Sequence, residues 1–370
     1  MDNDSLVTLF CELVRIPSPS GQEAAVAAAI KERLETAGIT CAFDNAQNDS
    51  NTHNLIARVP GDPALPVLLF VAHMDTVETG EKPIKPLVKD GIITSDGSTV
   101  LGADDKAAVA CLLEILPEIA GQPARPTVIA AFTTREEQGQ MGSSLLDLPE
   151  KIDMAFNIDG PNELGDFAYQ MLGETPFSVI IHGKAAHAAV EPEKGANALV
   201  AAGNILVALP IGKNEQGTVL NIGTVRGGIA NNVVPDFAEL RGQARAYTQT
   251  DLDEMLKTVE TTVADACSSA GCTYEFALEP EKGAPPAALA TDHPMVDLVN
   301  KATADAGFTF NLIKLAGTSD ANYLAAHYPT LTVCRGSKHP HAFSEEVSIA
   351  DLHGLKRLLH SLIAVAGKKA

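Results

Sequence analysis

The chain has 370 residues, of which 47 are acidic and 27 basic, so its formal net charge at pH 7 is −20. This acidic balance argues against nucleic acid and anionic membranes as partners, because both are polyanions. Hydrophobic residues make up 45% of the chain, and a single core stops growing at roughly 250 to 300 residues, so we expect a soluble protein of two domains.

The amino-terminal part alternates helical and extended segments. A capping-box pattern, Ser20-Gly-Gln-Glu23, precedes the second helix. The strand over residues 67–72 is apolar throughout, which indicates burial on both faces, and it ends in His73-Met-Asp75. In an extended chain these two polar side chains point to the same side, at the edge where open α/β sheets bind ligands. The elements predicted so far are helices over 5–15 and 24–37 and strands over 39–43, 54–59 and 67–72.

Three more apolar strands, predicted over 127–132, 154–158 and 330–334, also end in side chains that can bind a metal. A helix that opens at Gly102-Ala-Asp-Asp-Lys106 adds two carboxylates, although acidic residues in a first helical turn are also ordinary complements of the helix dipole. Each of these polar strand ends and helix starts alone has a structural explanation. Their occurrence at several places in one chain is what indicates a metal site. The candidates are His73, Asp75, Asp104, Glu136, Glu137, Asp159 and His341, with His339 as a neighbour.

The middle of the chain has a different pattern. Antiparallel strands and two helices follow one another in the order β-α-β-β-α-β, which fits a small open sheet with both helices on one face. We therefore expect an inserted domain over 175–280 within a discontinuous domain of 1–174 and 281–370. Its predicted elements are strands over 177–182, 219–225, 238–247 and 273–278 and helices over 196–209 and 252–268, the second with a capping box at Thr250-Asp-Leu-Asp253.

Imidazoles and carboxylates without thiolates are the ligand set of a hydrolytic zinc, cobalt or manganese site, whereas a structural zinc more often recruits cysteine. Two divalent ions also balance the charge of Asp104, Glu137, Asp159 and one bridging hydroxide. A single ion would leave these carboxylates repelling one another, with at least one pKa raised. The sequence therefore favours a pair of ions.

The six cysteines lie mostly among apolar neighbours and form no Cys-x-x-Cys pair, which is typical of reduced, buried thiols. We recognise no secretory signal and no run of the ~20 apolar residues that cross a bilayer. These features predict a cytoplasmic protein.

Eight segments spread over nearly the whole chain carry a resemblance to a known family. They are His73-Met-Asp75, Gly102-Ala-Asp-Asp-Lys106, Arg135-Glu-Glu137, Asn157-Ile-Asp159, Gly183-Lys-Ala-Ala-His187, Asn231-Asn-Val-Val-Pro235, Gly317-Thr-Ser-Asp320 and His341-Ala-Phe-Ser-Glu345. With these segments in this order, the chain resembles the co-catalytic metallopeptidases that include peptidase T, carboxypeptidase G, aminoacylase and succinyl-diaminopimelate desuccinylase. It is most similar to the peptidase T-like branch.

The resemblance implies a role for each metal ligand. His73 and Asp159 would bind one divalent ion and Glu137 and His341 the other, while Asp104 would bridge both. The ions would be Zn²⁺, with Co²⁺ or Mn²⁺ as alternatives.

The resemblance also implies how the reaction proceeds. Asp75 would hold the imidazole of His73 in the tautomer that offers its free nitrogen to the metal. Glu136 would be the general base, taking a proton from a metal-bridging water and passing it to the leaving amine. A cis peptide bond would join Asp104 to Asp105.

Three residues of the inserted domain match the family's substrate-binding positions. His187 would approach the metal site from this domain. In dimeric members of the family, the corresponding histidine comes from the inserted domain of the partner subunit. Arg245 and Asn231 would hold the terminal carboxylate of the substrate, which a guanidinium can bind through two hydrogen bonds. A homodimer through the inserted domain is consistent with this resemblance.

We therefore predict an α/β protein with a mixed, mostly parallel sheet and helices on both faces, of the zinc-exopeptidase type, plus an inserted ferredoxin-like α+β lid. The predicted reaction is hydrolysis of a peptide bond in a small peptide, as by a tripeptide aminopeptidase. An N-acyl amino acid amidohydrolase or a carboxypeptidase would use the same metal centre. Outside the enzyme class, the alternative is a metal-binding protein without catalysis, against which the presence of Glu136 beside all five ligands argues.

Overall fold

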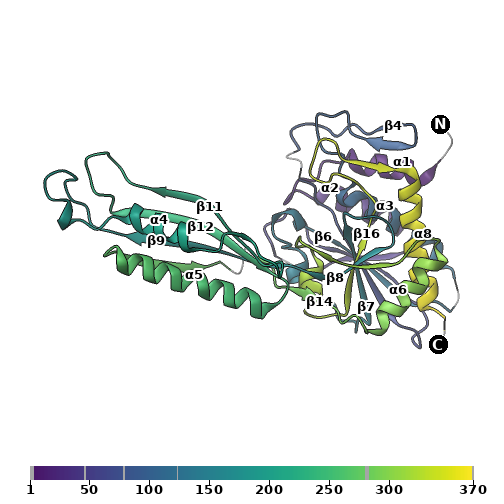
Figure 1. Cartoon of the computed structure of the whole chain (residues 1–370). Helices are drawn as coiled ribbons and strands as arrows, with labels where there is room; N and C mark the ends of the chain where they lie inside the picture. The colour runs from purple at the N-terminus through teal and green to yellow at the C-terminus, as the bar shows by residue number, and fades with distance from the viewer. Residues whose placement is uncertain (1–3, 46, 78–79, 123, 280–282, 369–370) are drawn as a thin grey trace. The chain divides into compact units, whose positions relative to one another are not determined.

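The structure is a computed structural model that describes residues 4–45, 47–77, 80–122, 124–279 and 283–368. The chain forms two compact units (Figure 1). The first unit comprises Met1–Gln170, Ala288–Leu315 and Ser319–Ala370, and the inserted unit comprises Met171–Ala287 and Ala316–Thr318. Of the two boundaries expected from the sequence, 174/175 and 280/281, the second lies outside the described residues.

The strands of the main sheet of the first unit are β1 (Thr40–Phe43), β2 (Leu55–Val59), β3 (Val67–His73), β6 (Thr127–Thr133), β7 (Met154–Gly160), β8 (Asp166–Met171), β15 (Asn311–Leu315) and β16 (Thr330–Cys334). They follow the order β1-β2-β6-β3-β7-β16-β8, with β15 also beside β8 and a ninth, two-residue strand over Ala287–Ala288 next to β8 at the edge. The central strands β6, β3, β7 and β16 are parallel neighbours. Their carboxyl ends therefore meet at one edge of the sheet, which is where open α/β sheets bind ligands.

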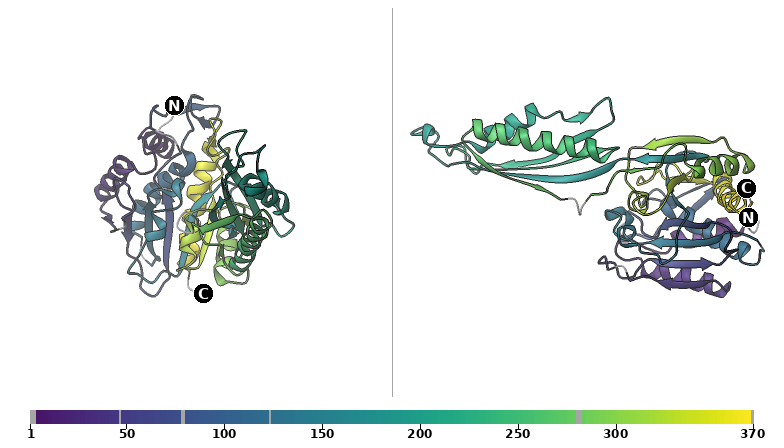
Figure 2. Two further views of the ribbon diagram at one scale, coloured as in Figure 1. Left: turned by 90° about the vertical axis from the view of Figure 1, so that its left-hand side faces the viewer. Right: turned by 90° about the horizontal axis from the view of Figure 1, so that it is seen from below.

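Helices pack on both faces of this sheet. They are α1 (Ser5–Val14), α2 (Ala24–Thr36), α3 (Ala103–Ala120), α6 (Pro294–Asp305), α7 (Ala321–Leu324) and α8 (Ile349–Ala366). Alternate residues of β3 enter two cores: Leu68 and Phe70 belong to the core that includes α1, α2, α3, α6 and α8, whereas Leu69 and Val71 pack in a second core with Leu324 of α7. The continuous apolar run thus forms a strand buried on both faces, as predicted. Figure 2 shows α8, in yellow, next to α6.

A small separate sheet and two short strands complete the element list. The small sheet contains β4 (Leu87–Lys89), β5 (Ile92–Thr94) and β17 (Glu346–Ser348). The two short strands lie at sheet edges: β14 (Ala287–Ala288) neighbours β8 in the main sheet, and β10 (Gly212–Lys213) pairs with β11 (Val219–Gly227) of the inserted unit. Pairing of β17 with β5 matters for the site, because it holds the segment that follows His341 against the loop before α3.

The inserted unit contains β9 (Gly173–His182), α4 (Ala198–Ala208), β11 (Val219–Gly227), β12 (Phe237–Ala246), α5 (Gln249–Ser269) and β13 (Thr273–Leu278). Its antiparallel strands lie in the order β11-β12-β9-β13. On β9, Phe177, Val179 and Ile181 are buried in a core shared with α4 and α5, while the residues between them are more exposed. One sheet face therefore carries both helices, and the predicted ferredoxin-like fold is confirmed.

Both predicted capping boxes are wrong, for different reasons. The N-cap of α2 is Glu23 and makes no side-chain capping bond; Ser20 instead donates its hydroxyl to Asp75. Helix α5 begins earlier than expected, because Thr248 accepts a hydrogen bond from the backbone nitrogen of Asp251 at 3.1 Å. The Thr-x-x-Asp pattern that caps the helix is therefore Thr248 to Asp251, two residues before the predicted one.

Two further expectations concern the compartment. All six cysteines are free, and all but Cys41 are buried. Within the described part of the chain, no helix has the combination of length and apolar character that a membrane crossing requires.

Candidate metal centre

The candidate ligands converge around Asp104. Its Oδ1 lies 2.9 Å from Nε2 of His73, and its Oδ2 lies 3.4 Å from Nε2 of His341. Ligand atoms of His73, Asp104 and Asp159 lie within 4.8 Å of one another, and so do those of Asp104, Glu137 and His341. These two groups share the Asp104 carboxylate, an arrangement suited to a pair of divalent ions, and a third group joins His73, Glu136 and Glu137.

The parallel strands explain why these residues meet. His73 ends β3, Asp159 lies near the end of the neighbouring β7, and a 3₁₀ turn after β6 carries Glu136 and Glu137. His341 lies in the loop after β16, with a left-handed φ of +63° that is uncommon for a residue other than glycine. His339 begins the same turn, since its carbonyl accepts a hydrogen bond from Ala342 at 3.2 Å.

Asp104 itself is fixed by the start of α3. The peptide bond between Asp104 and Asp105 is cis, as predicted, and both residues depart from helical geometry. The Glu345 carboxylate accepts hydrogen bonds from the backbone nitrogens of Gly102 at 2.7 Å and Asp104 at 2.9 Å. A buried acid from the carboxyl-terminal part of the chain therefore positions Asp104.

Asp75 makes a broader set of contacts than predicted. Nδ1 of His73 lies 3.0 Å from the carbonyl oxygen of Asp75 and 3.4 Å from its carboxylate Oδ1. Either acceptor can take the proton of Nδ1, so Nε2 is the nitrogen that the ring presents to Asp104 and could present to a metal. The Asp75 carboxylate also accepts hydrogen bonds from the backbone nitrogens of Glu136 and Glu137 and from the Ser20 hydroxyl. It therefore ties the turn after β6 to the end of β3.

Glu136 has the surroundings of a proton acceptor. Its side chain is buried, and burial together with the charge of Asp159 raises its pKa well above the usual glutamate value. The Gln140 side-chain amide donates to Oε1 of Glu136 at 3.1 Å, which fixes the direction of the carboxylate. A base with a raised pKa holds a transferred proton more readily than an ordinary glutamate does.

The electrostatics of the ligands fit a cationic group. Burial and the charge of Asp104 raise the pKa of Asp159 to about 7. Oε1 of Glu137 is buried and has no hydrogen-bond partner, although it lies 3.0 Å from Nε2 of His341. A buried, unsatisfied carboxylate oxygen within a cluster of acids is the kind of donor that divalent cations bind. The residues present therefore fit the predicted pair of ions.

Sequence reasoning missed Arg335, which is 1% exposed. Its Nη2 lies 2.6 Å from Oδ2 of Asp104 and its Nη1 lies 2.6 Å from Oδ1 of Asp159. Burial alone would raise the pKa of Asp104, but the Arg335 charge and hydrogen bonds from the two histidines hold it well below its usual range. Arg335 follows β16 directly, so its position at a strand end was visible in the sequence. It was overlooked because a guanidinium does not bind metals.

The three predicted substrate-binding residues lie in the inserted unit, but not together. Arg245 pairs in register with Glu174 and lies 2.6 Å from its carboxylate. His187 and Asn231 belong to loops near the other end of the sheet, where Ala188 donates a backbone hydrogen bond to Asn232. Strand β12 separates the two places by roughly 25 Å at about 3.3 Å per residue. Arg245 and Asn231 of one chain therefore do not meet around one carboxylate.

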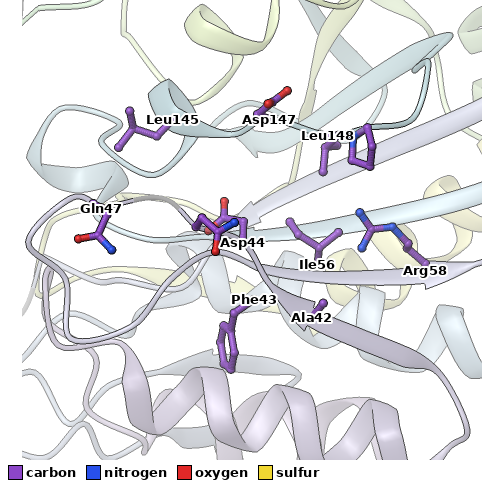
Figure 3. A pocket seen from close by; sticks show the side chains of 11 residues that line it. Ala42, Phe43, Asp44, Gln47, Ile56, Arg58, Leu145, Asp147 and Leu148 are labelled. Carbon is purple, nitrogen blue, oxygen red and sulfur yellow. The ribbon is translucent and has the colours of Figure 1, made fainter.

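A pocket of about 540 Å³ opens in the first unit beside β1 and β2 (Figure 3). Phe43, Ile56, Arg58, Leu145 and Leu148 are among its lining residues, and none of the candidate ligands is. The cavity is therefore separate from the metal centre.

The chain is similar in sequence and structure to proteins of one known family. Residues 69–365 match the model of Peptidase family M20/M25/M40. The chain is similar to the crystal structure of aminopeptidase PepT from Bacillus cereus, with 28% identity and a TM-score of 0.92 over 98% of both chains. It is equally similar to the crystal structure of a tripeptidase from Staphylococcus aureus, with the same identity, TM-score and coverage. An uncharacterized protein, YqjE of Bacillus subtilis (strain 168), is 29% identical over 98% of both chains.

Proposed function

The chain belongs to Peptidase family M20/M25/M40, as its sequence motifs predict, and we propose that it is a metal-dependent, tripeptide aminopeptidase-like exopeptidase. The observation that carries this proposal is the shared carboxylate of Asp104, which faces His73 with one oxygen and His341 with the other. The similarity to an aminopeptidase and a tripeptidase along almost the whole chain supports a small peptide as the substrate.

We assign His73 and Asp159 to one divalent ion, Glu137 and His341 to the second, and Asp104 to both. Zn²⁺ is the proposed ion, with Co²⁺ or Mn²⁺ as alternatives, because the ligands are imidazoles and carboxylates. When bound, such ions polarise a carbonyl group and lower the pKa of water.

Glu136 is the proposed general base. Its carboxylate accepts a proton from the attacking water and delivers that proton to the amine that leaves when the peptide bond breaks. Gln140 orients the carboxylate through its amide, and Asp75 holds the backbone nitrogen of Glu136 in place. Asp75 also lies beside the imidazole of His73, so one residue positions both the base and a ligand.

His187, Asn231 and Arg245 are the proposed substrate contacts of the inserted unit. Since Arg245 is far from the other two within one chain, we propose that two chains contribute to each site, in a homodimer formed through the inserted unit. The outer side of α4 supports this, because Val200 and Val207 are 52% and 89% exposed. An apolar stripe of this kind is typical of an interface. Analytical ultracentrifugation of the wild type and of Val207→Lys tests the dimer.

The reduced cysteines support a cytoplasmic location.

Two other reactions would use the same centre: hydrolysis of an N-acyl amino acid, and removal of a carboxyl-terminal residue. The deciding experiment incubates zinc- and cobalt-loaded protein with unblocked tripeptides, the same tripeptides acetylated at the amino terminus, and N-acetyl amino acids. Mass spectrometry of the products should show the free amino-terminal residue from the unblocked tripeptides alone. Release of the carboxyl-terminal residue, or of acetate, would replace the proposal by one of the two alternatives.

A further inference from the structure

We propose that Arg335 is a built-in cation of the metal centre, which holds the carboxylates of Asp104 and Asp159 in place by itself and weakens the binding of divalent ions. This inference rests on the proposed function, because it presupposes that these carboxylates are metal ligands.

The backbone delivers Arg335 directly to the ligands. Cys334, the last residue of β16, pairs with Gly160 of β7, and the Arg335 nitrogen donates to the Gly160 carbonyl at 2.9 Å. Asp159 is the residue before Gly160, so the parallel pairing sets the two side chains next to one another. The Arg335 side chain is then fixed by Ser337, whose hydroxyl accepts a hydrogen bond from Nε at 2.8 Å.

The guanidinium contacts the oxygens that face the imidazoles. Oδ2 of Asp104, 2.6 Å from Arg335, is also the oxygen 3.4 Å from His341. Oδ1 of Asp159, 2.6 Å from Arg335, is also the oxygen 3.9 Å from His73. Arg335 thus touches one carboxylate oxygen in each of the two ligand groups. Each oxygen has a second lone pair for an ion, so the guanidinium and the ions share these carboxylates.

The charge of Arg335 is permanent. An imidazole or an amine can lose its proton when an ion approaches, whereas an arginine in a protein stays protonated. In a buried site with weak solvent screening, this fixed charge repels each incoming ion. The same charge attracts Asp104 and Asp159, which would otherwise repel one another. Arg335 should therefore stabilise the protein without ions and reduce its affinity for them.

The test compares Arg335→Gln with Lys338→Gln. Both substitutions remove one positive charge from the loop after β16, but Lys338 is 54% exposed and lies 3.8 Å from its half-buried partner Glu346. Each protein is stripped with a chelator and titrated with Zn²⁺ against a competing chromophoric chelator. The melting temperature of each is measured before and after loading.

Arg335→Gln should bind Zn²⁺ at least tenfold more tightly than the wild type, melt at a lower temperature after chelation, and gain more from loading. Lys338→Gln should match the wild type in all three. Unchanged or weaker binding by Arg335→Gln would overturn the inference. If that variant folds only with Zn²⁺, this supports it, and Arg335→Lys, which keeps the charge, should then bind within threefold of the wild type. Should the wild type bind no divalent ion, the proposed function itself fails.

Discussion

Oδ1 of Asp75 lies 3.0 Å from the backbone nitrogen of Glu136. The same carboxylate accepts a bond from the nitrogen of Glu137 at 3.1 Å and from the Ser20 hydroxyl at 2.6 Å. Asp75 thereby connects the proposed base to the strand that carries His73. Burial would raise the pKa of Asp75, but the imidazole of His73, followed by the hydrogen bonds from Ser20 and the Glu136 backbone, lowers it below the usual aspartate value.

Asp75→Asn should lower kcat by about 10- to 100-fold with a small change in KM, because the new amide presents hydrogens to backbone nitrogens that need an acceptor. Steady-state kinetics with a tripeptide substrate measure this. Ser20→Ala is the matched control, since it removes one of the three bonds and keeps the carboxylate; its loss should stay below tenfold. Equal losses in the two variants would contradict the assigned role of Asp75.

Glu136→Gln should keep both ions and lose about 10²- to 10⁴-fold in kcat, the usual contribution of a general base. The amide has the shape of the acid but cannot accept the proton. Elemental analysis of the purified variant gives the ion content, and a peptide assay gives the rate. A variant that retains wild-type turnover would remove Glu136 from the mechanism, and one that loses its ions would make it a ligand instead.

Binding of an ion should release protons and should strengthen between pH 6 and pH 8. The neighbouring carboxylates of Asp104 and Glu137 raise the pKa of His341 to about 10, and burial with the charge of Asp104 raises that of Asp159 to about 7. Both groups therefore carry protons at pH 6 that an ion must displace, and Asp159 has lost most of its own by pH 8. Calorimetry in buffers of different ionisation enthalpy counts these protons. An affinity for the ion that falls as the pH rises from 6 to 8 would contradict this prediction.

Gly160→Ala should destabilise the first unit by about 1–3 kcal/mol. A Cβ at this position would meet Sγ of Cys334 at 2.4 Å and its Cα at 2.8 Å, so β7 and β16 would have to separate beside Asp159. Gly203→Ala in α4 is the control, because a Cβ there meets nothing within 4 Å and should stabilise the inserted unit by about 0.5–1 kcal/mol. Urea unfolding, followed separately for each unit, measures both. Equal effects in the two variants would contradict the close packing at Gly160.

The features that could be predicted are those with a local signal. Strand β3 was recognisable because Val67 to Ala72 are all apolar, and His73 stood out because it ends that run. Strand β8 has no such run, since Asp166, Tyr169 and Gln170 interrupt it, and it was missed.

Contacts between distant segments could not be predicted in the same way. Ser20 reads as a helix cap in the sequence, and only the folded chain brings it to Asp75. The sequence does not give the register of β12 against β9. In the structure this register puts Arg245 at one end of the strand pair, away from Asn231. The charged contacts of Arg335 likewise depend on the pairing of β16 with β7, which the sequence does not specify.

The two imidazoles of the centre differ in access, since the His341 side chain is 53% exposed and that of His73 only 1%. His341 lies in the loop that follows β16 and is the more exposed of the two, so exchange of the two proposed ions should have different rates. The ion beside His341 should leave first in the presence of a chelator and return first on reloading, while the ion beside His73 exchanges slowly. The half-loaded protein would then be a distinct species with its own spectrum when Co²⁺ occupies the remaining position.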